Sequence, residues 1–289
     1  MSKASMKEKR IGRIRDYIRP LSVGVFRNVK RVSNGSLRAF CYGDTHHGYQ
    51  DDKTLAVVQA IMEDHNPHVV VDMGDGVDAG MLSDKFRQDP MRSTGLQYEI
   101  DEKRKQLARF RSVVPDAEYW YLEGNHEERL RRTLWNLEGP AKALVKLNVV
   151  QDKLTWPVLL STEALGINFV SYDDQTQTKI LPKFITKHGT MIRPASGNTA
   201  HAELRKYGRS GASGHTHRLG AVWRRDHHGQ HVWIETGCCA NLRPEYEPDP
   251  DWQNGCVVLT FDEKTAAVSV EPVEIRNGHT IWRGKVYKA

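Results

Sequence analysis

Apolar and polar positions along residues 37–125 alternate between the period of a strand and that of a helix. The short apolar runs "LRAFCY", "HVVVDMGD" and "EYWYLEG" are typical of buried strands. Between them, "DDKTLAVVQAIMEDHNP" places Leu55, Val58 and Ile61 on one helical face, and "QYEIDEKRKQLARFRSVVP" predicts a second, charged helix. This alternation predicts parallel strands joined by crossover helices.

The pattern changes in the second half of the chain. Residues around 127–157 favour helix, and strand-like runs follow, from "INFVSY" and "FITKHG" through "QHVWIETGCC" and "GCVVLTF" to "IWRGKVY". The segment 243–252, "RPEYEPDPDW", has no periodicity and predicts a loop. We therefore expect an α/β fold with sheet packed on sheet and helices outside. It would form a single domain over 37–289, with a helical insertion around 127–157 and a β-rich C-terminal part.

Residues 1–36 are predicted to be a basic extension. Residues 1–32 contain ten Lys or Arg and two acidic residues, a net charge of +8 in a chain of +6, so the remainder carries −2. Ile11, Ile14 and Ile18 recur at helical spacing and predict a short amphipathic helix. The "SNGS" that follows predicts a hairpin turn. Such an arm suits an anionic partner such as nucleic acid, and a solvated helix that aids solubility is the alternative.

The apolar runs and the cysteines of the sequence bear on the cellular compartment of the protein. No run of about 18 apolar residues exists, so no membrane span is expected. The cysteines Cys41, Cys238, Cys239 and Cys256 lack paired C-x-x-C spacing and lie in strand-like segments. We expect reduced core thiols and a cytoplasmic protein. The oligomeric state is left open.

Side chains that bind metals follow the predicted strands. They are Asp44, His46, Asp75, Asn125, His188, His215 and His217. Loops at the carboxyl ends of strands converge in α/β sheets, so these side chains can meet. Imidazoles, carboxylates and an amide suit divalent ions such as Mn, Fe or Zn. Seven ligands are too many for one tetrahedral ion, but with one bridging carboxylate they give two ions four ligands each.

The same residues stand in short motifs in a fixed order: D-T-H at 44–46, G-D-G-V-D at 74–78, G-N-H-E at 124–127, H-G at 188–189 and G-H-T-H at 214–217. Over roughly residues 37–240 the set resembles the calcineurin-like metallophosphoesterase superfamily. The resemblance implies a four-layer α/β/β/α sandwich of two mixed sheets flanked by helices. It also implies a cofactor of two divalent ions, with Mn as first choice and Fe, Zn, Ni or Mg as alternatives.

The resemblance assigns roles to the motif residues. One ion would be held by Asp44, His46, Asp75 and His217, and the other by Asp75, Asn125, His188 and His215. A hydroxide bridging the metals would attack phosphorus, with His126 as general acid and Glu127 orienting it. His126, Glu127 and the bridging Asp75 are thus the catalytic candidates.

The residues themselves support part of this assignment. His126 lies at a predicted helix start, where backbone N–H groups and the helix dipole favour phosphate. Asp78 is expected to hydrogen-bond a ligand. His47 and Arg129 are candidates for contact with substrate, the alternative being an exposed surface.

Two positions bear on the substrate. Ala79 stands where the Ser/Thr phosphatase branch has a phosphate-clamping arginine, and Glu123 stands where an arginine is usual before G-N-H-E. The D-T-H-x-G form is more similar to the nuclease and phosphodiesterase branch. The leading hypothesis is a metal-dependent nuclease acting on nucleic acid phosphodiesters, with a DNA exonuclease as one form. A phosphomonoesterase for protein or small-molecule phosphates and a cyclic-nucleotide phosphodiesterase are alternatives, and a metal-free interaction scaffold is the least favoured.

Overall fold

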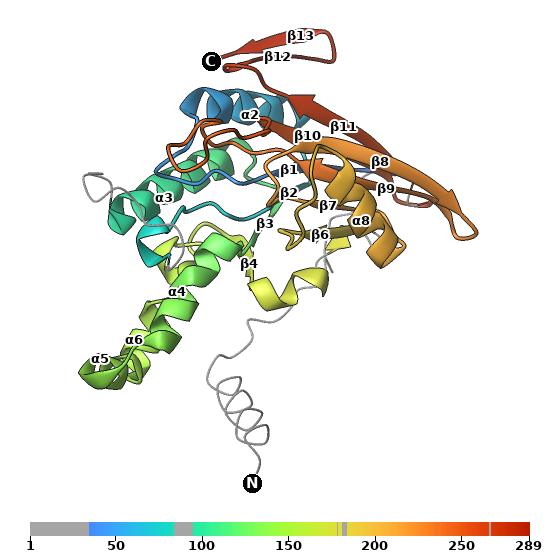
Figure 1. The fold of residues 1–289 in the computed structure, drawn as a ribbon. Helices are drawn as coiled ribbons and strands as arrows, with labels where there is room; N and C mark the ends of the chain where they lie inside the picture. The colour runs from blue at the N-terminus through green and yellow to red at the C-terminus, as the bar shows by residue number, and fades with distance from the viewer. Residues whose placement is uncertain (1–34, 84–94, 178, 181–183, 266) are drawn as a thin grey trace.

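The first sheet combines parallel strands with an antiparallel edge. The computed structural model describes residues 35–83, 95–177, 179–180, 184–265 and 267–289. The first sheet has the order β11-β10-β1-β2-β3-β4 (Figure 1). Its strands are β1 (Ser36–Tyr42), β2 (Val69–Asp72), β3 (Glu118–Leu122), β4 (Ile167–Val170), β10 (Gly255–Asp262) and β11 (Val268–Glu274). β1 to β4 pair in parallel, whereas β10 and β11 are antiparallel additions beside β1.

The second sheet has the order β5-β6-β7-β9-β8. Its strands are β5 (Lys179–Ile180), β6 (Phe184–Lys187), β7 (Gly211–Ser213), β8 (Leu219–Asp226) and β9 (Gly229–Thr236). β6, β7 and β9 are parallel to one another, and the outer strands β5 and β8 are antiparallel to their neighbours. Each sheet is therefore mixed, as predicted.

Helices cover the outer faces of the two sheets. They are α2 (Asp52–His65) and α3 (Leu96–Val113) on the first sheet, and α8 (Asn198–Tyr207) on the second (Figure 1). Side chains of β1 alternate, so that Phe40 and Tyr42 pack against α2 and α3 while Ala39 and Cys41 face the second sheet. Both faces of the first sheet are thus buried, which explains its continuous apolar runs. The predicted four-layer α/β/β/α sandwich is confirmed.

The remaining elements lie outside the sandwich. The helices of the segment predicted around 127–157 are α4 (Asn125–Asn136), α5 (Gly139–Val145), α6 (Asn148–Lys153) and α7 (Trp156–Leu159), and α4 to α6 project away from the sheets (Figure 1). Two short 3₁₀ helices span Gly80–Leu82 and Tyr172–Gln177. The hairpin β12 (His279–Trp282) and β13 (Lys285–Lys288) packs on α2, where the hydroxyl of Tyr287 donates to Asp64 at 2.7 Å.

Some expectations from the sequence need correction, and others concern residues outside the described ranges. "IWRGKVY" was expected as one run of strand but is a hairpin, because Arg283 and Gly284 both take left-handed φ and reverse the chain. Helix α8 had no counterpart among the predicted elements. The amphipathic helix around Ile14 and the first strand of the "SNGS" hairpin lie outside the described residues. All four cysteines lie in described segments and are free and buried. Within the described ranges, no helix has the length and apolar character that crossing a bilayer requires.

Candidate metal centre

The predicted ligands lie together where parallel strands of both sheets end. The loops after β1, β2, β6 and β7 carry Asp44 and His46, Asp75, His188, and His215 and His217 in turn, and Asn125 begins α4 just after β3. At their centre is Oδ2 of Asp75, which lies 3.2 Å from Nε2 of His188 and 3.8 Å from Nε2 of His46. One carboxylate oxygen between two imidazoles is the arrangement expected of a ligand shared by two cations.

One set of ligand atoms gathers around His46. Nε2 of His217 lies 2.9 Å from Nε2 of His46 and 3.4 Å from Oδ1 of Asp44. Nδ1 of His46 faces the carboxylate of Asp78 at 3.2 Å, and because a carboxylate only accepts, Nδ1 carries the proton. The lone pair of Nε2 therefore points at the other ligands, which suits it to bind a cation.

A second set gathers around His188. Its Nδ1 donates to the backbone oxygen of Met73 at 2.8 Å, while its Nε2 lies 3.0 Å from Oδ1 of Asn125 and faces Asp75. His215 completes the set, since ligand atoms of Asp75, His188 and His215 lie within 4.8 Å of one another. Two imidazoles and a carboxylate whose ligand atoms converge in this way are a donor set that divalent ions accept. The residues present therefore fit a divalent ion.

Burial and the neighbouring charges set the pKa values of these groups. Burial lowers the pKa of His188 but the carboxylate of Asp75 outweighs it, which raises that pKa to about 9. Burial raises the pKa of Asp44 to about 7. Burial and the neighbouring His188 lower the pKa of His215 to about 3, and burial lowers that of His217 to about 3 as well. The last two rings are thus neutral at pH 7 and available as ligands.

The ligand loops have an unusual backbone. Left-handed φ values occur at Asp44 (48°), His46 (41°), Asp75 (47°), His215 (71°) and His217 (58°). For a residue with a side chain, this region costs about 1–2 kcal/mol. Strained residues of this kind cluster at functional sites, where the surrounding structure holds them in place. Five of the seven predicted ligands share the feature, which marks these loops as a built site.

Two glycines allow the carboxylates to approach the backbone. A Cβ on Gly124 would lie 2.0 Å from Oδ1 of Asp75, and one on Gly214 would lie 2.5 Å from Oδ2 of Asp44. The backbone N–H of His126 donates to that same oxygen of Asp75 at 2.8 Å. The motif glycines are therefore required by close contact with the ligand carboxylates.

His126 lies at the open side of the cluster. Its side chain is 15% exposed, against 2% for Asp75, so it is within reach of a substrate. Its Nδ1 donates to the backbone oxygen of Asp78 at 2.7 Å and lies 3.4 Å from the Asp78 carboxylate. Arg129 donates to Nε2 of His126 at 2.9 Å and to the same backbone oxygen at 2.8 Å. Burial lowers the pKa of His126, but Asp75 and Asp78 outweigh it and the pKa is raised.

Glu127 has a different place from the one that the motif suggested. It was expected to orient His126, but its buried carboxylate accepts from the backbone N–H groups of Gly124, Asp75, Gly76 and Val77 at 2.7–3.1 Å. The hydroxyl of Tyr121 also donates to it at 2.6 Å. Asp78 contacts the ring of His126 instead. Glu127 is the acceptor around which the Asp75 turn and the start of α4 are organised.

His47 does not face a substrate path. Its backbone pairs with Val77, and its ring lies among side chains of α3, where Lys103 and Gln106 act on it. The side chain is 2% exposed. Burial, helped by Lys103, holds the pKa of His47 well below its usual value. The expectation that His47 contacts substrate is therefore wrong.

A loop that carried no motif passes beside the cluster. In this mouth loop (residues 243–253), the ring of Trp252 lies 4.2 Å from that of His217, centroid to centroid, and the N–H of Gln253 donates to the His217 carbonyl. Burial and Asp78 raise the pKa of Tyr246, which places this side chain near the site. The loop also carries exposed carboxylates, at Glu245, Glu247, Asp249 and Asp251. In the sequence, only the aromatic residues of this Pro-rich segment could have pointed to a place beside the site.

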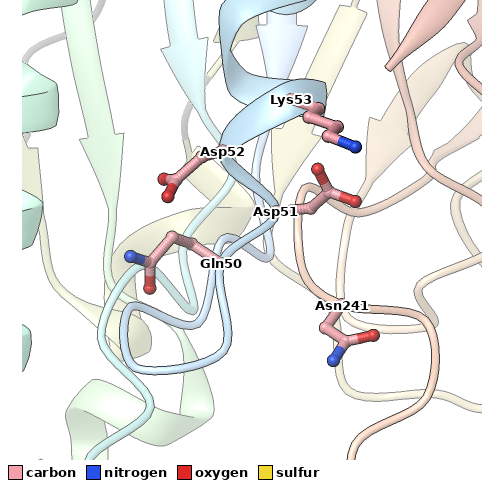
Figure 2. A pocket seen from close by; sticks show the side chains of 5 residues that line it. All are labelled: Gln50, Asp51, Asp52, Lys53 and Asn241. Atoms are coloured by element: carbon pink, nitrogen blue, oxygen red, sulfur yellow. The ribbon is translucent and has the colours of Figure 1, made fainter. Parts of the chain in front are cut away.

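A shallow pocket at the start of α2 holds none of the predicted ligands. It is lined by Gln50, Asp51, Asp52, Lys53 and Asn241 (Figure 2). Asp51 caps α2 through its side chain, which accepts from the N–H of Thr54 at 2.9 Å. The predicted chemistry therefore lies in the ligand cluster and not in this pocket.

The fold and the site define a metal-dependent phosphoester hydrolase. The family model for calcineurin-like phosphoesterases matches residues 37–249, and the chain belongs to that family, which is dinuclear and metal-dependent. Among curated proteins it is similar to the Gene 54 protein of Mycobacterium phage D29, with 27% identity over 252 residues, 82% of this chain and 94% of the relative. It is also similar to the Gene 54 protein of Mycobacterium phage L5, with 27% identity over 267 residues, 88% and 99% of the two chains.

Solved structures with a related arrangement share little sequence with this chain. Vacuolar Protein Sorting 29 from Cryptosporidium parvum has a TM-score of 0.42 and 12% identity, covering 88% of this chain and 96% of its own. Yfce, a phosphoesterase from E. coli, has a TM-score of 0.37 and 14% identity, covering 81% and 98%. Purple acid phosphatase PPD1 from yellow lupin (Lupinus luteus) has a TM-score of 0.37 and 13% identity, covering 88% and 53%.

Proposed function

We propose that the chain hydrolyses phosphodiester bonds of nucleic acid with two divalent cations, Mn²⁺ as first choice. The ligands would be Asp44, His46, Asp75, Asn125, His188, His215 and His217, with Asp75 shared. The observation that carries the proposal is the position of Oδ2 of Asp75 between the rings of His46 and His188. When bound, the cations supply an activated water and neutralise charge on the phosphoryl oxygens.

His126 is proposed as the proton donor to the leaving oxygen. Its Nε2 lies 3.9 Å from Oδ2 of Asp75, the proposed shared ligand, and its Nδ1 is fixed by Asp78. A leaving alkoxide is a poor leaving group, so a proton delivered as the bond breaks accelerates the step. Arg129 holds Nε2 in the structure and is proposed to turn its guanidinium to a phosphoryl oxygen when substrate binds.

Charge at the site favours a diester. Ala79 is buried, and its N–H is already used by the carboxylate of Glu99 at 2.8 Å. No bidentate arginine can act from that position, and Arg129 is the cation beside His126. A diester carries one negative charge and a monoester up to two, so a site to which the described residues contribute few cations suits the diester. We also propose that residues 37–289 act as one domain, with the basic residues 1–36 adding contacts to a nucleic acid.

One observation favours a second candidate, a phosphodiesterase for small substrates such as cyclic nucleotides. The mouth loop carries exposed carboxylates at Glu245, Glu247 and Asp249, and they oppose the approach of a polyanion. A small phosphodiester avoids this repulsion. The size of the substrate separates the two candidates.

A substrate panel tests the proposal. The full chain with Mn²⁺ is assayed on single- and double-stranded DNA, RNA, cyclic nucleotides, bis(p-nitrophenyl) phosphate and p-nitrophenyl phosphate, with Asp75→Asn as the inactive control. Cleavage of the polynucleotides and the bis-ester, with little of the monoester, is expected. Turnover of cyclic nucleotides but not of polynucleotides supports the second candidate. Turnover of the monoester alone overturns both.

A further inference from the structure

A fully buried lysine lies directly beneath the candidate metal centre. Nζ of Lys103, on α3, donates to Oδ2 of Asp72 at 2.7 Å and to Oγ1 of Thr45 at 3.2 Å, and all three side chains are inaccessible to solvent. The rings of Tyr42 and Tyr121 lie 5.7 and 5.2 Å from Nζ. Removing an ion from water costs several kcal/mol, and a buried ion pair seldom repays that cost in stability. A gain in stability therefore does not explain why Lys103 is buried at this position.

The ammonium group joins the two loops that follow β1 and β2. Thr45, which accepts from Lys103, lies between the predicted ligands Asp44 and His46, and its hydroxyl donates to the backbone oxygen of Gly76 at 3.0 Å. A Cβ on Gly76 would lie 2.4 Å from Cε of Lys103, so the lysine touches this turn from below. The backbone of Asp44 and His46 already donates to Gly74 and Asp75 across the two loops at 2.8 and 2.9 Å. The path from Lys103 through Thr45 to Gly76 adds a side-chain link to these backbone bonds.

The partner of the lysine holds the other side of the same turn. Oδ1 of Asp72 accepts from the N–H of Gly74 at 3.2 Å, while its Oδ2 accepts from Lys103. Asp75, between the two glycines, is thus held from both sides by one ion pair. Left-handed backbone at a candidate ligand persists only where the surroundings enforce it, and this pair adds to the hold that Glu127 has on the same turn.

We propose that Lys103 is a positioning residue that sets the spacing of the ligand loops and so the affinity of the ion held by Asp44, His46 and His217. The inference rests on the ligand set of the proposed function. The ion held by Asn125, His188 and His215 takes its ligands from loops that Lys103 does not touch, apart from the shared Asp75. Loss of the lysine should weaken the first ion more than the second.

The test is a titration of the metal-free full chain with Mn²⁺ by calorimetry. Lys103→Met alone would leave Asp72 buried and unpaired, so it is combined with Asp72→Asn to remove both charges. We expect one of two binding steps to weaken about 10- to 100-fold, the range seen when support of a metal ligand is lost. Thr45→Val keeps the ion pair of Lys103 and Asp72 and removes only the hydroxyl that joins Lys103 to Gly76. This variant replaces the double variant in the titration if the double variant does not fold. It should weaken the same step by a smaller factor.

A second buried pair provides the matched control. Lys187 and Glu203 lie 2.9 Å apart with side-chain exposures of 4% and 0%, and Lys187 contacts α8 through Tyr207. Lys187→Met with Glu203→Gln removes equal charge without touching the loops after β1 and β2. The binding step of the ion held by Asp44, His46 and His217 should therefore stay within about twofold of the parent, the scatter of matched variants. Melting temperatures of the metal-free proteins show whether each variant folds.

The outcomes separate this inference from the proposed function. Asp75→Asn should abolish the tight binding of both ions. If it binds Mn²⁺ like the parent, the ligand set fails and this inference falls with it. If Asp75→Asn loses the ions while the Lys103 and Thr45 variants bind like the parent, the inference alone is overturned. Equal weakening by the Lys187 control overturns it too, because the effect is then general to buried charge.

Discussion

Glu127 offers a sharp test of how the site is built, because one carboxylate serves five donors. Its Oε1 accepts from the N–H groups of Gly76 and Val77 and from the hydroxyl of Tyr121, and its Oε2 accepts from the N–H groups of Asp75 and Gly124. Glu127→Gln keeps the shape but replaces one oxygen with an NH₂ group. The Gln side chain can take two orientations. The more favourable one keeps the amide oxygen at the position of Oε1, where the N–H groups of Gly76 and Val77 and the hydroxyl of Tyr121 converge.

The cost of the change follows from what is left unpaired. The NH₂ group of Gln would face the N–H groups of Asp75 and Gly124, so two buried donors lose their acceptor. Each unsatisfied donor costs about 1–3 kcal/mol, so the variant should lose about 2–6 kcal/mol of unfolding free energy. For a chain of this size, 1 kcal/mol corresponds to about 2 °C, and the melting temperature should fall by about 4–12 °C.

Calorimetry of the metal-free protein measures this loss without the contribution of bound ions. Glu102→Gln on α3 is the control, because the Glu102 side chain is 26% exposed and pairs with Lys105 at 2.6 Å on the surface. Such pairs are worth about 0–1 kcal/mol, so this variant should melt within about 2 °C of the parent. If the two variants melt together, the role given to Glu127 is refuted. An unchanged melting temperature with an altered pH–rate profile would restore its role in orienting His126.

Three further predictions follow from other parts of the molecule. His126→Ala should keep two Mn²⁺ per chain by elemental analysis while turnover falls about 10²- to 10⁴-fold, and parental turnover would contradict the proton-donor role. Deleting residues 1–32 removes ten cationic side chains, so DNA binding should weaken and its salt dependence should flatten; an unchanged slope would exclude the arm from DNA contact. Burial and nearby arginines lower the pKa of His65 to about 4, so the stability held by its neutral ring is full above pH 6.5 and is lost as pH falls toward 4, by up to about 1.4 kcal/mol per pH unit. His65→Gln should flatten that acid limb in urea unfolding at pH 7 and 4.5, and equal losses in both proteins would argue against it.

Much of the sandwich was predictable because its signals are local. The apolar strands β1 to β3 and the amphipathic helices α2 and α3 are each defined by their own periodicity. The ligand residues follow strands directly, so the rule that loops meet at the carboxyl ends of strands brings them to one edge. Their grouping in space follows from topology and not from any one motif.

The missed features depend on contacts between distant segments. α8 has a narrow apolar stripe, Ala200 and Leu204, inside a polar stretch, and its helix is stabilised by packing on Trp233 of β9. The lowered pKa of His47 depends on its burial and on Lys103, which lies 56 positions along the chain. The acceptor role of Glu127 depends on a turn that lies in another loop. No short-range pattern encodes such pairings.

The order of the first sheet has a consequence for how the chain is made. β1 is the first described strand to leave the ribosome, yet its antiparallel neighbour β10 lies beyond residue 254 and is among the last. Until then one edge of β1 has no partner, and an open edge invites pairing with other chains. The nascent protein must therefore shield that edge through most of its synthesis, and a chain that stops where the family match ends, at residue 249, would lack the strand that covers it.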